Sequence, residues 1–303
     1  MRAGRPSRTA EQNAAFRAAE SARPPGVRLL NDPYAARLLP PGLRILAWIS
    51  SVPMVGGGLN WFVDTRWPGA RSSIIARTRL IDEWLCAAMR VGLEQVVLLG
   101  AGFDSRAWRL PAVAHARVFE VDHPSTSAEK RRRLANLGTD RAHVRFVPVD
   151  FDRQMPADGL AQAGFDSSQR AIVIWDGVTN YLQPEAVDKI TSWVGGLAEG
   201  GQFIFTYIHS GVLDGSMSFE GAAAVLKAVR RAGEPWVQLL KVDRLCSVVD
   251  GAAAVDLMYS AAERCKRLSS ICRLCGHASM YPASDRSVLC SGPPWISART
   301  RSH

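Results

Sequence analysis

The feature that most constrains this sequence is an apolar run that breaks into a turn of small residues. Residues 95–99 (QVVLL) are typical of a strand that is covered on both faces of a parallel sheet. Gly100 and Gly102 follow at once, and glycines let the backbone turn sharply and let a ligand approach closely. Asp104 and Ser105 are then placed to cap a short helix. A strand, a turn of small residues and a helix together predict a nucleotide-type binding site.

Strand-like and helix-like patterns alternate after this point. Further strands are predicted at residues 117–122, 143–149, 171–175 and 202–208, with helices at 125–137 and 184–197. Strands that alternate with helices indicate parallel βαβ units. The sequence therefore predicts an α/β fold with a doubly wound, mostly parallel sheet.

The residues before this core are helical. A helix that Thr9 caps is predicted over residues 10–21, and Asp32, which proline follows, opens a second helix. Residues 72–89 carry apolar side chains at helical spacing, which predicts an amphipathic helix. Residues 45–63 contain no charged side chain, but proline and a run of glycines interrupt them. We therefore expect broken apolar helices there rather than a membrane span.

We expect the chain to divide into three parts. Residues 1–90 form an N-terminal helical cap with a lead-in helix, and residues 91–236 form the ligand-binding core. Residues 237–303 form a divergent C-terminal region, which has few strand-like runs and holds most of the cysteines. Either a shifted reading frame in the gene or a genuine divergent substrate domain would explain this change in composition.

The cysteines point to no metal. Cys272 and Cys275 lie near His277 in a spacing that could suggest zinc, but a second pair at finger spacing is missing. Free thiols in a reduced cytoplasm are the preferred interpretation. The start of the chain has arginines with no apolar run behind them, so it lacks a signal-peptide pattern and we expect a cytoplasmic protein.

The formal net charge is +9, and it comes from arginine far more than from the five lysines. The densest basic cluster is Lys130 to Arg133, and no aromatic residues interleave with it as they would in a surface that stacks on bases. We interpret this cluster as a solvated helix face. Nucleic acid is therefore not expected as a partner.

Carboxylates follow three successive predicted strands, and parallel strands end at the same edge of a sheet. An aspartate after a single strand is usually a cap or turn residue, but three in succession favour a ligand. Asp122, rather than Glu120, is suited to accept from both hydroxyls of a ribose. Asp150 can accept from the exocyclic amine of adenine beside Phe151, and Asp176 can meet a ligand ammonium group.

The sequence favours S-adenosylmethionine over NAD as the ligand. The segment from Gly100 to Ser105 has two glycines but lacks the third glycine of the dinucleotide-binding fingerprint. Asp104 also brings negative charge to the place where a pyrophosphate would lie. That charge would repel a phosphate and tolerate a positive sulfonium centre.

Several segments resemble one known family. RTRLIDEWL, VVLLGAGFDSRAWRL, VFEVDHP, FVPVDF and WDGVTNYL are similar to the leucine carboxyl methyltransferase family, and DPYAARLL near the start fits as well. The resemblance is strongest to its bacterial branch, which includes polyketide O-methyltransferases of the tetracenomycin type. It covers roughly residues 9–236 and fades after Trp236. It implies a class I methyltransferase (Rossmann-like) sheet, a helical cap and S-adenosyl-L-methionine as methyl donor.

The resemblance also implies roles for individual residues. Arg77 matches the arginine that holds the methionine carboxylate, and Gly100 matches the glycine of the cofactor turn, which Gly102 continues. Asp122 matches the ribose-binding acid, and Asp150 with Phe151 matches the pair beside adenine. At the position of Asp176 the family more often has glutamate, whose reach is longer. Arg17 matches a basic residue of the N-terminal lid.

The expected reaction is methylation of an oxygen on a small molecule of the secondary-metabolite type. A carboxylate acceptor needs no general base because it is ionised at neutral pH, whereas a phenol or enol would benefit from one. Tyr181, Tyr207 and His209 are the nearest candidate bases, but we interpret them as packing or wall residues. No catalytic residue is assigned, and the oligomeric state stays open.

Two non-enzymatic interpretations stand beside this one. A basic RNA-binding protein on a methyltransferase scaffold would bind nucleic acid with a steep dependence on salt. A degenerate member of the family would bind no cofactor at all.

Overall fold

The computed structural model describes residues 6–50, 52, 55–135, 141–208, 222–234, 236 and 253–258. Its strands are β1 (Gln95–Leu99), β2 (Arg117–Asp122), β3 (Val144–Pro148), β4 (Ala171–Trp175), β5 (Gln202–Tyr207) and β6 (Ala253–Met258). The first five agree with the predicted strands to within one residue at either end. The sixth lies in the C-terminal region, where the sequence showed few strand-like runs.

The strands form one sheet in the order β3-β2-β1-β4-β5-β6, and every neighbouring pair is parallel. In the register, Leu99 at the end of β1 stands opposite Val121 on one side and Trp175 on the other. The chain proceeds from β1 outward through β2 to β3 and then crosses back to β4 on the other side of β1. The strand order thus reverses between β1 and β4, which is the switch point of a doubly wound sheet. This confirms the predicted fold class.

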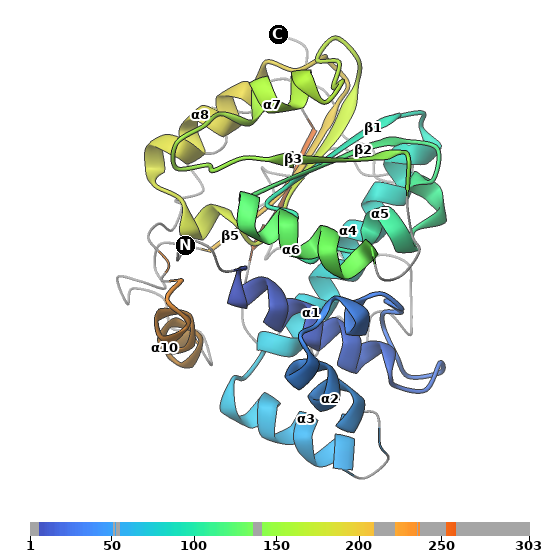
Figure 1. Ribbon diagram of the computed structural model, residues 1–303, viewed down its shortest axis with the longest axis vertical. Coiled ribbons are helices and arrows are strands. Elements are labelled where there is room, and N and C mark those ends of the chain that lie inside the picture. Colours follow the sequence, from blue (N-terminus) through green and yellow to red (C-terminus); the bar gives the residue numbers. More distant parts are fainter. Residues whose placement is uncertain are drawn as a thin grey trace, which may run out of the picture.

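Some helices lie on the two faces of the sheet, and the others gather at one end of the molecule (Figure 1). They are α1 (Arg8–Ser21), α2 (Pro41–Ile49), α3 (Val55–Arg66), α4 (Ala70–Arg90), α5 (Arg106–Arg109), α6 (Pro124–Ala135), α7 (Pro156–Gln162), α8 (Pro184–Gly195) and α10 (Ala222–Ala232). Short 3-10 turns η1 (Ala35–Leu38), η2 (Pro111–Val113) and η3 (Thr179–Tyr181) connect them. Helices α7 and α8 cover one face, and α4, α5 and α6 cover the other.

Two apolar cores follow from the alternation of side chains along β1. Val96 and Leu98 pack in a core with α4 and α1, and Val97 and Leu99 pack in the core under α7 and α8. All residues of β1 are buried, which explains why the strand is a continuous apolar run rather than an alternating one. Hydrophobic burial on both faces holds the carboxyl end of β1 in the middle of the molecule.

The helical segment before β1 also follows the prediction, with two corrections. Helix α1 begins at Arg8, and Ser7 caps it, because the Ser7 hydroxyl accepts a hydrogen bond of 3.1 Å from the Ala10 amide. The prediction that Thr9 caps this helix was therefore wrong. The Asp32 carboxylate accepts bonds from the Tyr34 and Ala35 amides at 3.1 and 3.0 Å, just before η1. This element is a 3-10 turn that begins at Ala35, so Pro33 precedes it instead of lying in the first turn of a helix.

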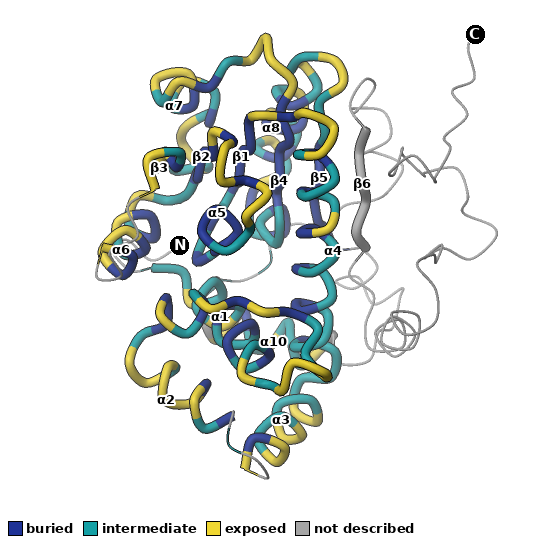
Figure 2. Tube along the Cα trace, turned by 90° about the vertical axis from the view of Figure 1, so that its right-hand side faces the viewer, coloured by how far each residue is buried: buried dark blue, intermediate teal, exposed yellow. Residues whose placement is uncertain are grey.

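The charge-free stretch forms α2 and α3 as separate helices (Figure 2). Among the described residues, no helix combines the length and the apolar character that crossing a bilayer requires. Helix α4 then runs along the cap and under the sheet, and it carries Arg77.

The basic cluster on α6 differs from the prediction of a solvated face. Lys130 is 1% exposed, and its ammonium lies 2.7 Å from the Glu120 carboxylate of β2. Arg133 is also buried and pairs with Glu11 at 2.7 Å. Two side chains of the cluster therefore lie inside the protein, where ion pairs with acids offset the cost of burying their charges. With fewer free cations on this helix, the case for an RNA-binding surface is weaker.

The buried pair of Glu120 and Lys130 generates a prediction about pH. Burial raises the pKa of Glu120 from 4.5 to about 7, although Lys130 opposes the shift. A carboxyl with a higher pKa in the folded state binds protons more tightly when folded, so stability falls as the pH rises from 4.5 to about 7. We expect the wild-type free energy of unfolding to lose about 3 kcal/mol over this range relative to the Glu120→Gln variant.

Chemical denaturation at a series of pH values measures this difference. The matched control is Glu199→Gln, because Glu199 is an exposed acid. Its pH profile should run parallel to that of the wild type. Parallel profiles for the wild type and Glu120→Gln would contradict the prediction.

Candidate functional site

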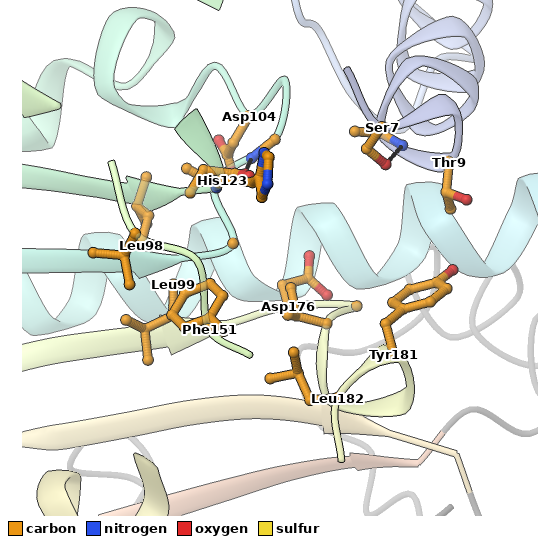
Figure 3. Close-up of a pocket in the computed structure, with 18 of the residues that line it drawn as sticks. Ser7, Thr9, Leu98, Leu99, Asp104, His123, Phe151, Asp176, Tyr181 and Leu182 are labelled. Carbon is orange, nitrogen blue, oxygen red and sulfur yellow. Dashed lines mark hydrogen bonds between the residues drawn. The ribbon is translucent and has the colours of Figure 1, made fainter. Parts of the chain in front are cut away.

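A cavity of about 1010 Å³ opens at the carboxyl ends of β1 and β4, at the switch point of the sheet. Residues from α1, α4, the turn after β1 and the loops after β2, β3 and β4 line it. It brings together all residues that the sequence predicted for cofactor binding: Arg77, Gly100, Gly102, Asp122, Asp150, Phe151 and Asp176. Figure 3 shows side chains from these separate elements facing one space.

The turn after β1 needs glycine for two reasons. Gly100 has φ of 66°, a conformation that side chains rarely adopt. A Cβ on Gly100 would also lie 2.2 Å from the Val178 side chain, which packs over the turn. Gly102 has φ of 48° and donates its amide to the Asp122 carboxylate. The backbone of the turn therefore forms one wall of the cavity.

Asp122 is fixed in place by backbone donors. One carboxylate oxygen accepts from the Gly102 amide and the other from the His123 amide at 2.6 Å. Burial raises the pKa of the Asp122 carboxyl, and these two donors partly offset the shift. Each oxygen keeps a further lone pair, so the carboxylate can still accept from two ligand hydroxyls. Glu120, the less favoured alternative, pairs with Lys130 and does not line the cavity.

Arg77 and Asp176 form an ion pair at the other side of the turn. The Arg77 Nε lies 2.7 Å from the Asp176 carboxylate, and both side chains are largely buried. The Thr206 hydroxyl donates to Asp176 at 3.2 Å and accepts from the Gly177 amide at 2.6 Å. This network orients a positive and a negative group side by side, which matches the two charges of an amino-acid tail.

Asp104 is not an isolated negative charge, and this corrects an argument made from the sequence. Its carboxylate contacts the Arg106 guanidinium, which also binds Asp82 at 2.8 Å. Burial alone would raise the pKa of Asp104, but Arg106 brings it well below the usual range. Repulsion between Asp104 and a phosphate is therefore largely compensated by this arginine.

A different feature now disfavours a dinucleotide. Helix α5 after the turn has only four residues, so it offers little of the dipole that holds a pyrophosphate at a longer helix. Asp104 caps this short helix by accepting from the Arg106 amide at 2.7 Å, whereas the predicted second cap, Ser105, donates its hydroxyl to Asp32 at 2.6 Å.

The loop after β3 contributes Asp150 and Phe151 to the far end of the cavity. The Asp150 carboxylate accepts from the Asp152 amide at 3.1 Å and lies 3.7 Å from Arg153, so it also stabilises its own turn. The Phe151 ring lines the cavity and offers it a flat apolar surface (Figure 3). This end of the cavity is suited to an aromatic base with a polar edge.

The roof of the cavity joins two distant parts of the chain. The Glu234 carboxylate, beyond α10, accepts from the Arg8 amide at 2.9 Å and from the Thr9 amide at 3.1 Å. The Ser7 hydroxyl donates to the same carboxylate at 3.2 Å. We call these four residues the Glu234 clasp. The sequence carried no signal for it, because its partners are more than 200 positions apart.

Arg17 also lines the cavity from α1, as the resemblance implied. Its Nε lies 2.9 Å from the Asp32 carboxylate, and its terminal nitrogen donates to the Phe103 carbonyl at 2.6 Å. Arg17 therefore ties α1 to the turn after β1.

Two of the three candidate bases, Tyr181 and Tyr207, are wall and packing residues as predicted. Tyr181 is a wall residue whose hydroxyl points to Thr9, and burial raises the pKa of this phenol (Figure 3). Tyr207 is 1% exposed and stacks on Phe205 at a centroid distance of 6.0 Å. It packs in the core and does not line the cavity. His209 lies outside the described residues.

Within the described ranges, no cluster of histidine, cysteine and acidic side chains could hold a metal ion. The predicted thiols at Cys272 and Cys275, with His277, lie in the part of the chain that the structure does not describe.

Comparisons with known proteins give a consistent result. A family model described as leucine carboxyl methyltransferase matches residues 10–195. A relative from Mycolicibacterium gilvum is 37% identical over 222 residues, which cover 71% of this chain and 69% of the relative. A relative from Mycolicibacterium vanbaalenii is 35% identical over 261 residues, with coverages of 84% and 81%. Both carry names that assign them provisionally to the S-adenosyl-L-methionine-dependent methyltransferases.

A crystal structure from Thermobifida fusca, whose title names a methyltransferase provisionally, is also similar. It is 18% identical, covers 78% of this chain and 77% of its own, and has a TM-score of 0.48.

The similarity extends further than the quoted segments suggested. The Mycolicibacterium vanbaalenii relative covers 84% of the 303 residues, so only about 48 residues lie outside the match. Since 67 residues follow Trp236, the match includes part of that region. The match to this relative therefore continues past Trp236, whereas the Mycolicibacterium gilvum relative covers 71% of the chain and the family model ends at residue 195.

The segments that carried the resemblance all lie inside the region that the family model matches. That region spans more than half of the chain, and the relatives cover most of it. The chain belongs to the leucine carboxyl methyltransferase family.

Proposed function

We propose that this chain is an S-adenosyl-L-methionine-dependent methyltransferase that methylates an oxygen atom of a small molecule. The observation that carries the proposal is the pair of Arg77 and Asp176, 2.7 Å apart beside the glycine turn. Few nucleotide-like ligands would need both a positive and a negative side chain of the protein at one end of the cavity. An amino-acid tail on a nucleoside needs both.

The residues present fit this cofactor. Arg77 would bind its carboxylate and Asp176 its ammonium group, because each offers the opposite charge. Asp122 would accept from the ribose hydroxyls through the lone pairs that Gly102 and His123 leave free. Phe151 and Asp150 would contact adenine at the far end of the cavity.

The cofactor supplies an activated methyl group, and the protein has to align the acceptor and exclude water. The Glu234 clasp fixes the start of α1 at the cavity, where it would help to shield the reacting groups from solvent. Tyr181 lines the cavity as a protonated phenol, and burial raises its pKa further above neutral. A carboxylate acceptor would need no base, because it is ionised at neutral pH.

Calorimetric titration with S-adenosylhomocysteine tests the proposal. We predict micromolar binding by the wild type and a loss of about 10- to 100-fold in Arg77→Ala, because a hydrogen bond to a charged group contributes about 1.5–3 kcal/mol. The matched control is Arg79→Ala on the same helix, since Arg79 pairs with Glu83 and does not line the cavity. Absence of binding by folded wild-type protein would favour the degenerate interpretation.

The Glu234 clasp leads to a second prediction about the same ligand. Without the carboxylate, the amides of Arg8 and Thr9 lose their acceptor and the roof should open more often. We expect Glu234→Ala to raise the dissociation rate of S-adenosylhomocysteine about fivefold or more, as about 1 kcal/mol of lost bonding implies.

Stopped-flow displacement measures this rate. Glu94→Ala is the control, because Glu94 is exposed and lies just before β1, at the opposite end of that strand from the cavity. Equal dissociation rates for Glu234→Ala and the wild type would show that the clasp does not retain the ligand.

A further inference from the structure

Helices α2 and α3 expose an unusual amount of apolar surface. Ile45 is 60% exposed, Trp61 is 70% exposed and Phe62 is 55% exposed. Leu46, Trp48 and Val55 are also largely exposed. We call these six residues the α2–α3 apolar face. Figure 2 shows that both helices are mostly exposed and lie at the end of the molecule away from the sheet.

The two helices hardly contribute to the cores. Only Ala47 of α2 and Gly56 of α3 are buried. Amphipathic helices normally bury their apolar side chains against the protein, and large exposed apolar side chains on neighbouring helices can mark an interaction site. Packing among the described residues therefore does not account for the α2–α3 apolar face.

The part of the chain that carries this face has an excess of positive charge. Arg37, Arg44 and Arg66 are exposed, and within the described ranges none of them has a carboxylate within 4 Å. Asp64 is the acid of this segment, and the Arg71 guanidinium donates to its two carboxylate oxygens at 3.0 and 2.6 Å. The surroundings of the apolar face are therefore cationic.

We propose that the α2–α3 apolar face docks on an anionic lipid surface. Exposed tryptophan and phenylalanine between arginines are the side chains that an interfacial helix places at the level of lipid headgroups. The helices have 9 and 12 residues, so they lie on a bilayer rather than cross it. A symmetric contact between two copies would bring the three arginines of each copy together, which like-charge repulsion disfavours.

The proposal does not rest on the proposed function. The apolar face belongs to α2 and α3, and none of its residues lines the cavity. Docking would place the cap on the lipid surface while the cofactor residues stay on the sheet. Cofactor binding and lipid binding can therefore be measured separately.

Sedimentation of the full chain with vesicles tests the proposal. One set of vesicles contains phosphatidylcholine alone, and the other contains phosphatidylcholine with phosphatidylglycerol. Three arginines without a carboxylate partner near an anionic surface imply a preference for the anionic vesicles on the order of a hundredfold at low salt. The preference should fall as salt is added.

Two variants separate the apolar and the charged contributions. The Trp61→Ser, Phe62→Ser variant should lose at least tenfold in binding to anionic vesicles. The Arg37→Gln, Arg44→Gln, Arg66→Gln variant should lose the difference between the two kinds of vesicle. The matched control is Val27→Ser, Val91→Ser, because Val27 and Val91 are 53% and 55% exposed but lie elsewhere. It should bind as the wild type does.

Unchanged thermal melting of each variant confirms that it is folded, which we expect because the replaced side chains are exposed. Wild-type protein that sediments equally with both kinds of vesicle, or with neither, would overturn the proposal. Self-association of the wild type that the Trp61→Ser, Phe62→Ser variant abolishes, without lipid binding, would show that a second copy occupies the face instead.

Discussion

The hydrogen bond between the Gly102 amide and the Asp122 carboxylate is the interaction on which the candidate site depends. It joins the turn after β1 to the end of the neighbouring strand β2, on one side of the switch point that lies between β1 and β4. Without it, the turn would have a free amide and Asp122 a poorly oriented carboxylate in a buried place. This hydrogen bond thus fixes the turn that forms the cavity wall and orients the Asp122 carboxylate.

Around this bond, the protein arranges charges in buried pairs. Arg106 contacts Asp104 and Asp82, and its nearest terminal nitrogen lies 3.9 Å from Asp176. Because these groups have little solvent around them, their positions depend on one another more strongly than surface ion pairs do. The site is therefore organised before any ligand arrives, which reduces the reorganisation that binding would require.

Much of the fold was predictable because its signals are local. Parallel strands that are buried on both faces are short continuous apolar runs, and the five predicted strands were placed to within one residue. Three acids at strand ends were also a reliable pattern, since the topology brings such ends together. By contrast, nothing in the neighbourhood of Lys130 reveals that its side chain turns inward to Glu120. The partners of Arg106 and Glu234 lie in other elements, so only the packed structure could identify them.

The Glu234 clasp has a consequence for the order in which this protein is made. Its acceptor lies beyond α10, whereas its donors are among the first described residues of the chain. During synthesis, the amides at the start of α1 stay without this acceptor until residue 234 has left the ribosome. By then, β1 to β5 are already available to form the sheet. The roof of the cavity is therefore one of the last features to assemble, so a nascent chain has an open site before it has a closed one.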